Sequence, residues 1–150
     1  MFRKTGLFAA AFLLAVSAPG AFAQDAIATA DGETTGTRIE VTELTRTSGE
    51  TITLKFRLVN EGSEVANPYG LMEGADVSNV HLIDAAGKKK YLVIKDSDGK
   101  CVCSGGLTTN SLESGKSMNL WARFPAPPVE VKEVSVVFPH FIPTDAPIAD

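Results

Sequence analysis

The stretch from Thr51 to Asn60, TITLKFRLVN, alternates apolar and polar side chains more regularly than any other part of the chain. The apolar residues fall on every second position: Ile52, Leu54, Phe56 and Leu58. Successive side chains of a strand point to opposite faces of a sheet, so this pattern predicts a strand with one buried and one solvated face. A chain built from such strands buries its apolar faces by stacking one sheet on another.

Shorter runs of β-forming residues recur along the chain, and turn residues separate them at intervals of about 8 to 12 positions. Strands are predicted at residues 38–45, 51–60, 77–85, 91–95, 117–124 and 130–138. In the first of these Leu44 falls out of phase, which indicates a bulge or the end of the strand. No segment after residue 23 has a helical period of useful length. The sequence therefore predicts an all-β fold, an immunoglobulin-like antiparallel β-sandwich of about seven strands.

The connections carry their own signals. Residues 64–74 contain an Asn-Pro pair and two glycines, which predicts a loop with at most a short edge strand. The strands at 77–85 and 91–95 form a predicted hairpin with Lys88, Lys89 and Lys90 solvated at its tip. Residues 125–128, Pro-Ala-Pro-Pro, predict an extended crossover. The tail, residues 139–150, holds three prolines and is expected to cover a sheet edge.

The first 23 residues have the pattern of a secretory signal peptide: a basic start at Arg3 and Lys4, an apolar run, and Ala21-Phe22-Ala23 as the cleavage site. The apolar run is shorter than the roughly 20 residues that span a bilayer. We expect cleavage after Ala23, a flexible leader at residues 24–36 and one domain at residues 37–150. The mature protein is then secreted or periplasmic, with no membrane span.

Cleavage would leave 12 basic and 18 acidic side chains, a net charge of -6. This sign argues against nucleic acid and against anionic lipid as partners, because both select basic surfaces. The expected partner is an envelope protein or polymer whose identity the sequence does not specify. Export also places the cysteines in an oxidising compartment, where disulfides persist.

Cys101 and Cys103 are the only cysteines, and their spacing puts both side chains on one face of a strand. We expect a local disulfide, whose three-residue loop contributes about 1.6 kcal/mol before strain is subtracted. Two alternatives remain open: a redox-active pair, or a Cu(I) site formed by the two thiolates. The soft or imidazole side chains that could complete a copper site are Met72, Met118, His81 and His140.

Catalytic machinery is hard to find in this sequence. Aligning Gly99 with the invariant glycine of a calcium-binding EF-hand puts Ile94 and Gly105 at ligand positions, which excludes that motif. The sequence has no glycine-framed serine, phosphate loop or pair of histidines at metal-binding spacing. We therefore expect a protein that is not an enzyme and that needs no cofactor or metal.

The candidate binding surface combines the loop at residues 96–106 with the strand and proline-rich crossover that follow. Its residues are Asp96, Asp98, Lys100, Trp121 and Arg123. Trp121 falls on the polar side of its strand, so it is either covered by a neighbouring loop or presented to a partner. Loops on a rigid scaffold are where binding usually resides.

Three stretches carry a resemblance: Asp96–Ser104 (DSDGKCVCS), Leu112-x-x-Gly115, and Leu120–Pro128 (LWARFPAPP). With the ending Phe141-Ile142-Pro143 and Pro147-Ile148, the chain resembles a group of uncharacterised exported bacterial domains of the immunoglobulin type. Some members stand beside a peptidoglycan-binding domain of the outer-membrane-protein-A type, which we do not find in this chain. The resemblance covers about Thr37 to Ile148. It implies the fold and an envelope location, and it implies no activity.

Overall fold

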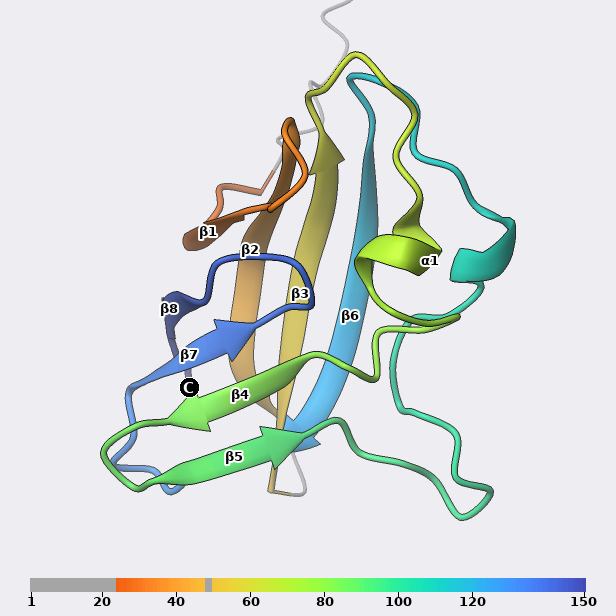
Figure 1. Ribbon diagram of the computed structural model, residues 1–150. Helices are drawn as coiled ribbons and strands as arrows, with labels where there is room; N and C mark the ends of the chain where they lie inside the picture. Colours follow the sequence, from red (N-terminus) through yellow and green to blue (C-terminus); the bar gives the residue numbers. More distant parts are fainter. Residues whose placement is uncertain (1–23, 48–49) are drawn as a thin grey trace, which may run out of the picture.

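A computed structural model describes residues 24–47 and 50–150, which form two antiparallel four-stranded sheets stacked on each other (Figure 1). The first sheet contains, in spatial order, β1 (Ala28–Asp31), β2 (Thr37–Thr47), β3 (Thr51–Asn60) and β6 (Ser117–Pro125). The second contains β5 (Lys89–Leu92), β4 (His81–Asp84), β7 (Glu133–Val137) and β8 (Thr144–Pro147). This confirms the predicted antiparallel β-sandwich, with eight strands instead of about seven. The predicted signal peptide, residues 1–23, lies outside the described residues.

Strand β3 has the predicted bounds and is one of the two central strands of the first sheet. It pairs along its length with β2 on one side and with β6 on the other. The register on the β2 side shifts between Val41 and Glu43, so the out-of-phase position of Leu44 marks a bulge and not the end of the strand. The shift lets Leu44 turn back into the core, where it is 1% exposed.

The core lies between the two sheets. Phe56 of β3 and Phe138, just after β7, are both buried, and their ring centroids are 4.8 Å apart. Phe141 meets Phe138 edge-on at 6.4 Å. These contacts join the inner faces of the sheets and show why the alternating residues of β3 need a second sheet. None of the helices in the described part of the chain is long and apolar enough to cross a membrane.

The predicted flexible leader is wrong in part, because residues 28–31 of it form strand β1. This strand pairs antiparallel with β2, and Ala30 lies opposite Ile39 and is 2% exposed. The alternating residues of β1 are alanines, so their apolar contrast with the polar neighbours is weak. The sequence pattern therefore did not predict this edge strand, because its side chains are small and the surrounding segment is polar.

Residues 64–74 were predicted as a loop, but part of this segment forms the short helix α1 (Pro68–Leu71). Proline suits the first turn of a helix, because its missing N–H would have no partner there. The turn buries Leu71 and Met72. Figure 1 shows α1 beside the 3-10 helix η1 (Leu107–Thr109), on the β6 side of the molecule.

The strand predicted at 77–85 is shorter than expected, since β4 begins only at His81. Val77 and Val80 are buried, but they belong to the irregular segment that leads into the strand. The hairpin pairing is confirmed, because β4 pairs with β5 and Lys88 turns the chain with a φ of 54°. The predicted tip is wrong in part, since Lys89 and Lys90 lie on strand β5, which begins and ends earlier than the predicted strand at 91–95. The predicted edge-covering tail is also confirmed, because β8 pairs with β7.

Candidate functional site

The segment after β5 runs along the edge of β6 that β3 leaves open. The N–H of Ile94 donates to the carbonyl of Arg123 at 2.9 Å, and the N–H of Arg123 donates to Val102 at 3.1 Å. The N–H of Ser104 then donates to the carbonyl of Trp121 at 2.8 Å. A bare strand edge would offer unpaired donors and acceptors to other chains. The segment at residues 94–107, called here the edge loop, covers that edge.

The tip of the edge loop is shaped by one carboxylate. Oδ1 of Asp96 accepts hydrogen bonds from the backbone N–H groups of Asp98 and Lys100, both at 2.9 Å. Gly99 has a φ of 78°, the left-handed conformation that glycine adopts without steric cost. Asp96 is therefore occupied in holding the turn. Asp98 and Lys100 are exposed beyond it.

Cys101 and Cys103 are joined by a disulfide in the edge loop. Their Cα atoms are 5.2 Å apart, which is within the ordinary disulfide range. The extended strand expected from the sequence would place them further apart, but the chain bends at Val102. Isolated bridges with Lys95 and Ala122 fix the two cysteines on either side of that bend.

A third residue, Asp76, lies beside the disulfide. A carboxylate oxygen of Asp76 and the sulfur atoms of both cysteines all lie within 4.8 Å of one another. Among the described residues, this is the group of three or more histidine, cysteine or acidic side chains that is close enough to hold a metal ion. Sequence reasoning missed Asp76, because no motif connects it to cysteines so far along the chain.

The side chains that could complete a copper site in the alternative reading of the sequence lie outside the group around the sulfur atoms or are wholly or partly buried. Neither His81 nor His140 belongs to the group around the sulfur atoms. His81 is on β4 of the second sheet, and burial lowers its pKa. His140 has Glu33 at 3.2 Å from one ring nitrogen and Glu73 at 3.2 Å from the other. The two methionines belong to or pack against the core: Met72 is fully buried and Met118 is partly buried.

Trp121 lies on the outer face of the first sheet and is 39% exposed. It stands opposite Lys55 of β3, while Asn119 stands opposite Arg57. On its other side the backbone N–H of Trp121 donates to Oγ of Ser104 at 2.9 Å. The edge loop and β3 therefore hold the Trp121 backbone from both sides and leave part of the indole open to solvent.

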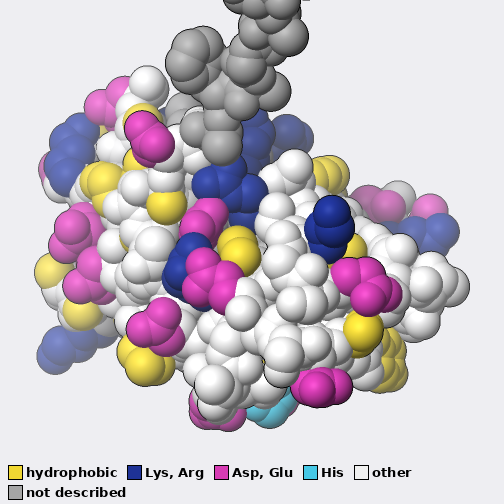
Figure 2. All heavy atoms as spheres, turned by 90° about the horizontal axis from the view of Figure 1, so that it is seen from above, with side chains coloured by type: hydrophobic (Ala, Val, Ile, Leu, Met, Phe, Trp, Pro, Cys, Tyr) yellow, Lys and Arg dark blue, Asp and Glu magenta, His cyan; other side chains and the backbone are white. Residues whose placement is uncertain are grey.

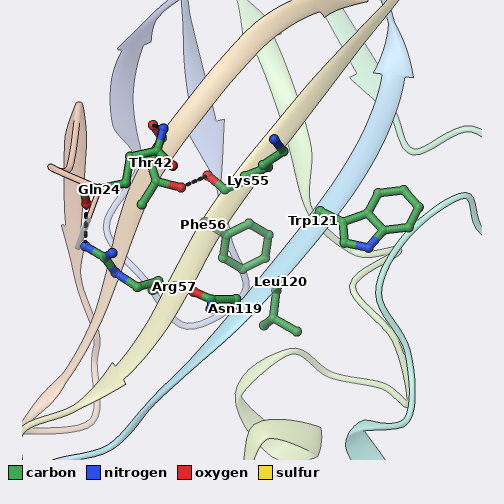
Figure 3. Close-up of a pocket in the computed structure, with 8 residues that line it drawn as sticks. All are labelled: Gln24, Thr42, Lys55, Phe56, Arg57, Asn119, Leu120 and Trp121. Atoms are coloured by element: carbon green, nitrogen blue, oxygen red, sulfur yellow. Dashed lines mark hydrogen bonds between the residues drawn. The ribbon is translucent and has the colours of Figure 1, made fainter. Parts of the chain in front are cut away.

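A shallow groove of about 380 Å³ runs across this face (Figure 3). Its lining consists of Gln24, Thr42, Lys55, Phe56, Arg57, Asn119, Leu120 and Trp121. Nη2 of Arg57 donates to the carbonyl of Gln24 at 2.9 Å, and Oγ1 of Thr42 donates to the carbonyl of Lys55 at 3.2 Å. Figure 3 shows the indole beside β6, at the opposite end of the groove from Gln24. The groove thus has an aromatic end and a polar end.

The charges near the groove are paired. Glu40 accepts hydrogen bonds from Nη2 of Arg38 at 2.7 Å and from Nε of Arg57 at 2.8 Å. Chiefly through the bond from Arg38, this lowers the pKa of Glu40. Nζ of Lys55 lies 2.8 Å from Glu43. Acidic and basic side chains are also interspersed over the end of the molecule seen in Figure 2.

The proline-rich crossover lines a separate groove of about 560 Å³ that includes no residue of the 96–106 loop. The guanidinium of Arg46 holds the crossover through three carbonyls: Pro127 at 2.6 Å, Pro128 at 2.9 Å and Val131 at 2.8 Å. In the same groove burial raises the pKa of Tyr91. The structure therefore joins Trp121 to the edge loop but gives the crossover a site of its own.

Of the residues predicted for the binding surface, Trp121 and Arg123 share the outer face of β6 and lie along the edge loop. Asp98 and Lys100 are at the loop tip, and the carboxylate of Asp96 accepts the backbone hydrogen bonds that hold that tip. No protein-family model, curated protein or solved structure matches the chain.

Proposed function

We propose that this chain is an exported binding module of the bacterial cell envelope or the surrounding medium, without catalytic activity. Its contact surface is the groove around Trp121. The observation that carries this proposal is the exposure of Trp121, the chain's only tryptophan, which is 39% exposed. Its strand, β6, is hydrogen-bonded to β3 on one side and to the edge loop on the other. An exposed indole on rigid backbone offers a large contact area at a small entropic cost. The resemblance to exported envelope domains supports the same location.

The chemistry of the groove favours a saccharide chain over a protein as the ligand. The groove volume of about 380 Å³ is within the range of small-molecule sites. A protein interface instead needs a contact surface of about 800 Å² on each partner with an apolar centre. Apart from Trp121 and the buried Phe56 and Leu120, the lining is polar. A sugar ring presents apolar C–H groups on its faces and hydroxyl groups on its rim. The indole suits the faces, and Asn119 and Lys55 suit the rim.

The single tryptophan allows a direct test. Protein expressed from the full chain is titrated with chitotetraose, an N-acetylated oligosaccharide, while the emission of Trp121 is recorded. We expect a saturable change in emission, because stacking replaces water against the indole. Calorimetry on Trp121→Ala should show binding weakened at least tenfold, which corresponds to about 1.4 kcal/mol. Asn119→Ala should weaken binding by a smaller factor.

Tyr69→Ala is the matched control, since Tyr69 is a 48% exposed aromatic residue on α1 and away from the groove lining. It should bind like the unmodified protein. Equal losses in the Tyr69 and Trp121 variants would contradict the groove as the contact surface. Binding of an envelope protein through Trp121 with no response to oligosaccharides would overturn the ligand class. A product that stays in the cytoplasm with residues 1–23 attached would contradict export.

A further inference from the structure

We propose that Asp76, Cys101 and Cys103 form a metal site that is closed by the disulfide and opened by its reduction. In the reduced protein the two thiolates and the carboxylate of Asp76 bind a borderline-soft divalent cation of the Zn²⁺ class. The juxtaposition that carries this inference is the position of all three ligand atoms within 4.8 Å of one another. The inference is independent of the saccharide groove.

The distances suit a tetrahedral ion once the disulfide is open. Zinc lies about 2.3 Å from thiolate sulfur and about 2.0–2.2 Å from carboxylate oxygen, so these ligand atoms are about 3.5–3.8 Å apart in a tetrahedron. The cysteine Cα atoms are 5.2 Å apart, and rotation of the two side chains separates the sulfur atoms without moving the backbone. Three protein ligands leave a fourth position for water or for another ligand.

Backbone contacts, and not the disulfide, hold Asp76 in place. Asp76 forms a bridge with Gly105, and the N–H of Val77 donates to the carbonyl of Ser104 at 3.2 Å. The N–H of Leu107 also donates to the carbonyl of Ala75 at 3.0 Å. These hydrogen bonds do not depend on the sulfur atoms, so the carboxylate stays beside the cysteines after reduction.

The Asp76 carboxylate is also oriented for binding. Its Oδ1 accepts a hydrogen bond from the N–H of Ser78 at 2.9 Å, which fixes the plane of the carboxylate. Such supporting hydrogen bonds are typical of carboxylates that ligate metals. The ligand set also indicates which metal binds. Cu(I) prefers sulfur alone, whereas two thiolates with one oxygen suit Zn²⁺. We therefore propose a zinc-type ion at the position for which the sequence left Cu(I) open.

The opening step balances as a thiol–disulfide exchange. A dithiol reductant transfers two electrons and two protons to the Cys101–Cys103 disulfide, whose S–S bond breaks to give two thiols while the reductant becomes a disulfide. Binding of the cation then releases the two thiol protons. A bound cation withdraws the thiolates from reoxidation, so metal and oxidant compete for the same pair of sulfur atoms.

The test uses Cd²⁺, a spectroscopic probe for Zn²⁺ whose bonds to thiolate absorb in the ultraviolet. Protein expressed from the full chain is reduced, freed of reductant under anaerobic conditions and titrated. We expect a charge-transfer band that saturates at one Cd²⁺ per monomeric chain and that Zn²⁺ removes. The oxidised protein and the Cys101→Ser/Cys103→Ser variant should show no band.

Asp76→Asn separates the proposed site from a simple pair of thiols. An asparagine oxygen still accepts from Ser78, so the fold is preserved, but the anionic ligand is lost. We expect Cd²⁺ affinity to fall at least tenfold while the thiolate band remains, and Asp98→Asn in the same loop to leave affinity unchanged. Equal affinities of Asp76→Asn and unmodified protein would overturn the site. Saturation at one Cd²⁺ for two chains would overturn it as well.

Discussion

Strand β6 has two neighbours that are held to it in different ways. On one side β3 pairs with it in unbroken register and buries an inner face of alternating apolar residues. On the other side the edge loop is held by isolated bridges, a braced turn and a disulfide. The comparison shows that buried apolar side chains stabilise the β3 side of β6, whereas local hydrogen bonds and a disulfide determine the conformation of the other side. Stability should therefore reside in β3, and the reactive groups reside in the loop.

The largest effect should come from Phe56→Ala in β3. The side chain is 1% exposed and packs against Phe138 of the opposite sheet, so truncation leaves a cavity between the sheets. We expect the free energy of unfolding to fall by about 3–5 kcal/mol, measured by urea denaturation. The outward neighbour Lys55→Ala should change it by less than about 0.5 kcal/mol. Similar losses in both variants would remove the distinction between the two faces of β3.

The same contrast explains what could be predicted from the sequence. Both ends of strand β3 were predicted correctly, because the alternation of apolar and polar residues lies within the strand itself. Strand β1 was missed because Ala28 and Ala30 contrast weakly with their neighbours. Helix α1 was missed because a single turn has no period to detect. These failures arise where short segments owe their structure to distant contacts.

The candidate site divides in the same way. The cysteine pair was visible because its spacing is local, and so was the odd position of Trp121 on a polar face. Asp76 was not visible, because bridges to residues 104–107 bring it to the sulfur atoms. The groove was also hidden, since Gln24 reaches it from a segment that was predicted as leader. Long-range pairing, and not residue type, decided which site residues sequence reasoning could find.

Arg46→Ala should have the second largest effect. It tests whether polar contacts contribute as much to the free energy of unfolding as the burial of an apolar side chain. The guanidinium donates to three carbonyls of the crossover, and its Nε lies 3.1 Å from Asp150. Hydrogen bonds from a charged group contribute about 1.5–3 kcal/mol, so we expect a loss of about 2 kcal/mol in urea denaturation. Arg46→Lys keeps the charge but not the fork of donors. Full stability in the lysine variant would contradict the role assigned to the fork.

Cys101→Ser/Cys103→Ser tests the loop side of the comparison. The closed loop is so short that its removal should cost at most about 1.6 kcal/mol of global stability. Amide hydrogen exchange should nevertheless accelerate at Ser104 and Arg123, whose N–H groups join the loop to β6. The N–H groups between β3 and β2 provide the internal reference. A fall in melting temperature of more than about 8 °C would show that the loop stabilises the whole sandwich.

The smallest effect tests whether the outer face of the first sheet contributes to stability at all. Hydrogen bonds from Arg38 and then Arg57 lower the pKa of Glu40 below its ordinary value of 4.5. The folded state therefore favours the carboxylate, and its contribution is complete above the pKa of the unfolded chain. It is lost as the pH falls through the lower pKa of the folded state. For a partly exposed pair we expect about 0.5–1 kcal/mol.

Glu40→Gln isolates this contribution, because glutamine keeps the shape of the side chain and cannot ionise. At pH 7 the variant should unfold at a lower urea concentration than the unmodified protein. The difference should disappear in acid, where the native carboxyl group is protonated and both proteins carry a neutral side chain. Glu43→Gln, which removes a single bond from the more exposed Lys55, should show a smaller difference at pH 7. A difference that persists unchanged in acid would show that the loss of the carboxylate charge does not cause the lower stability of the variant.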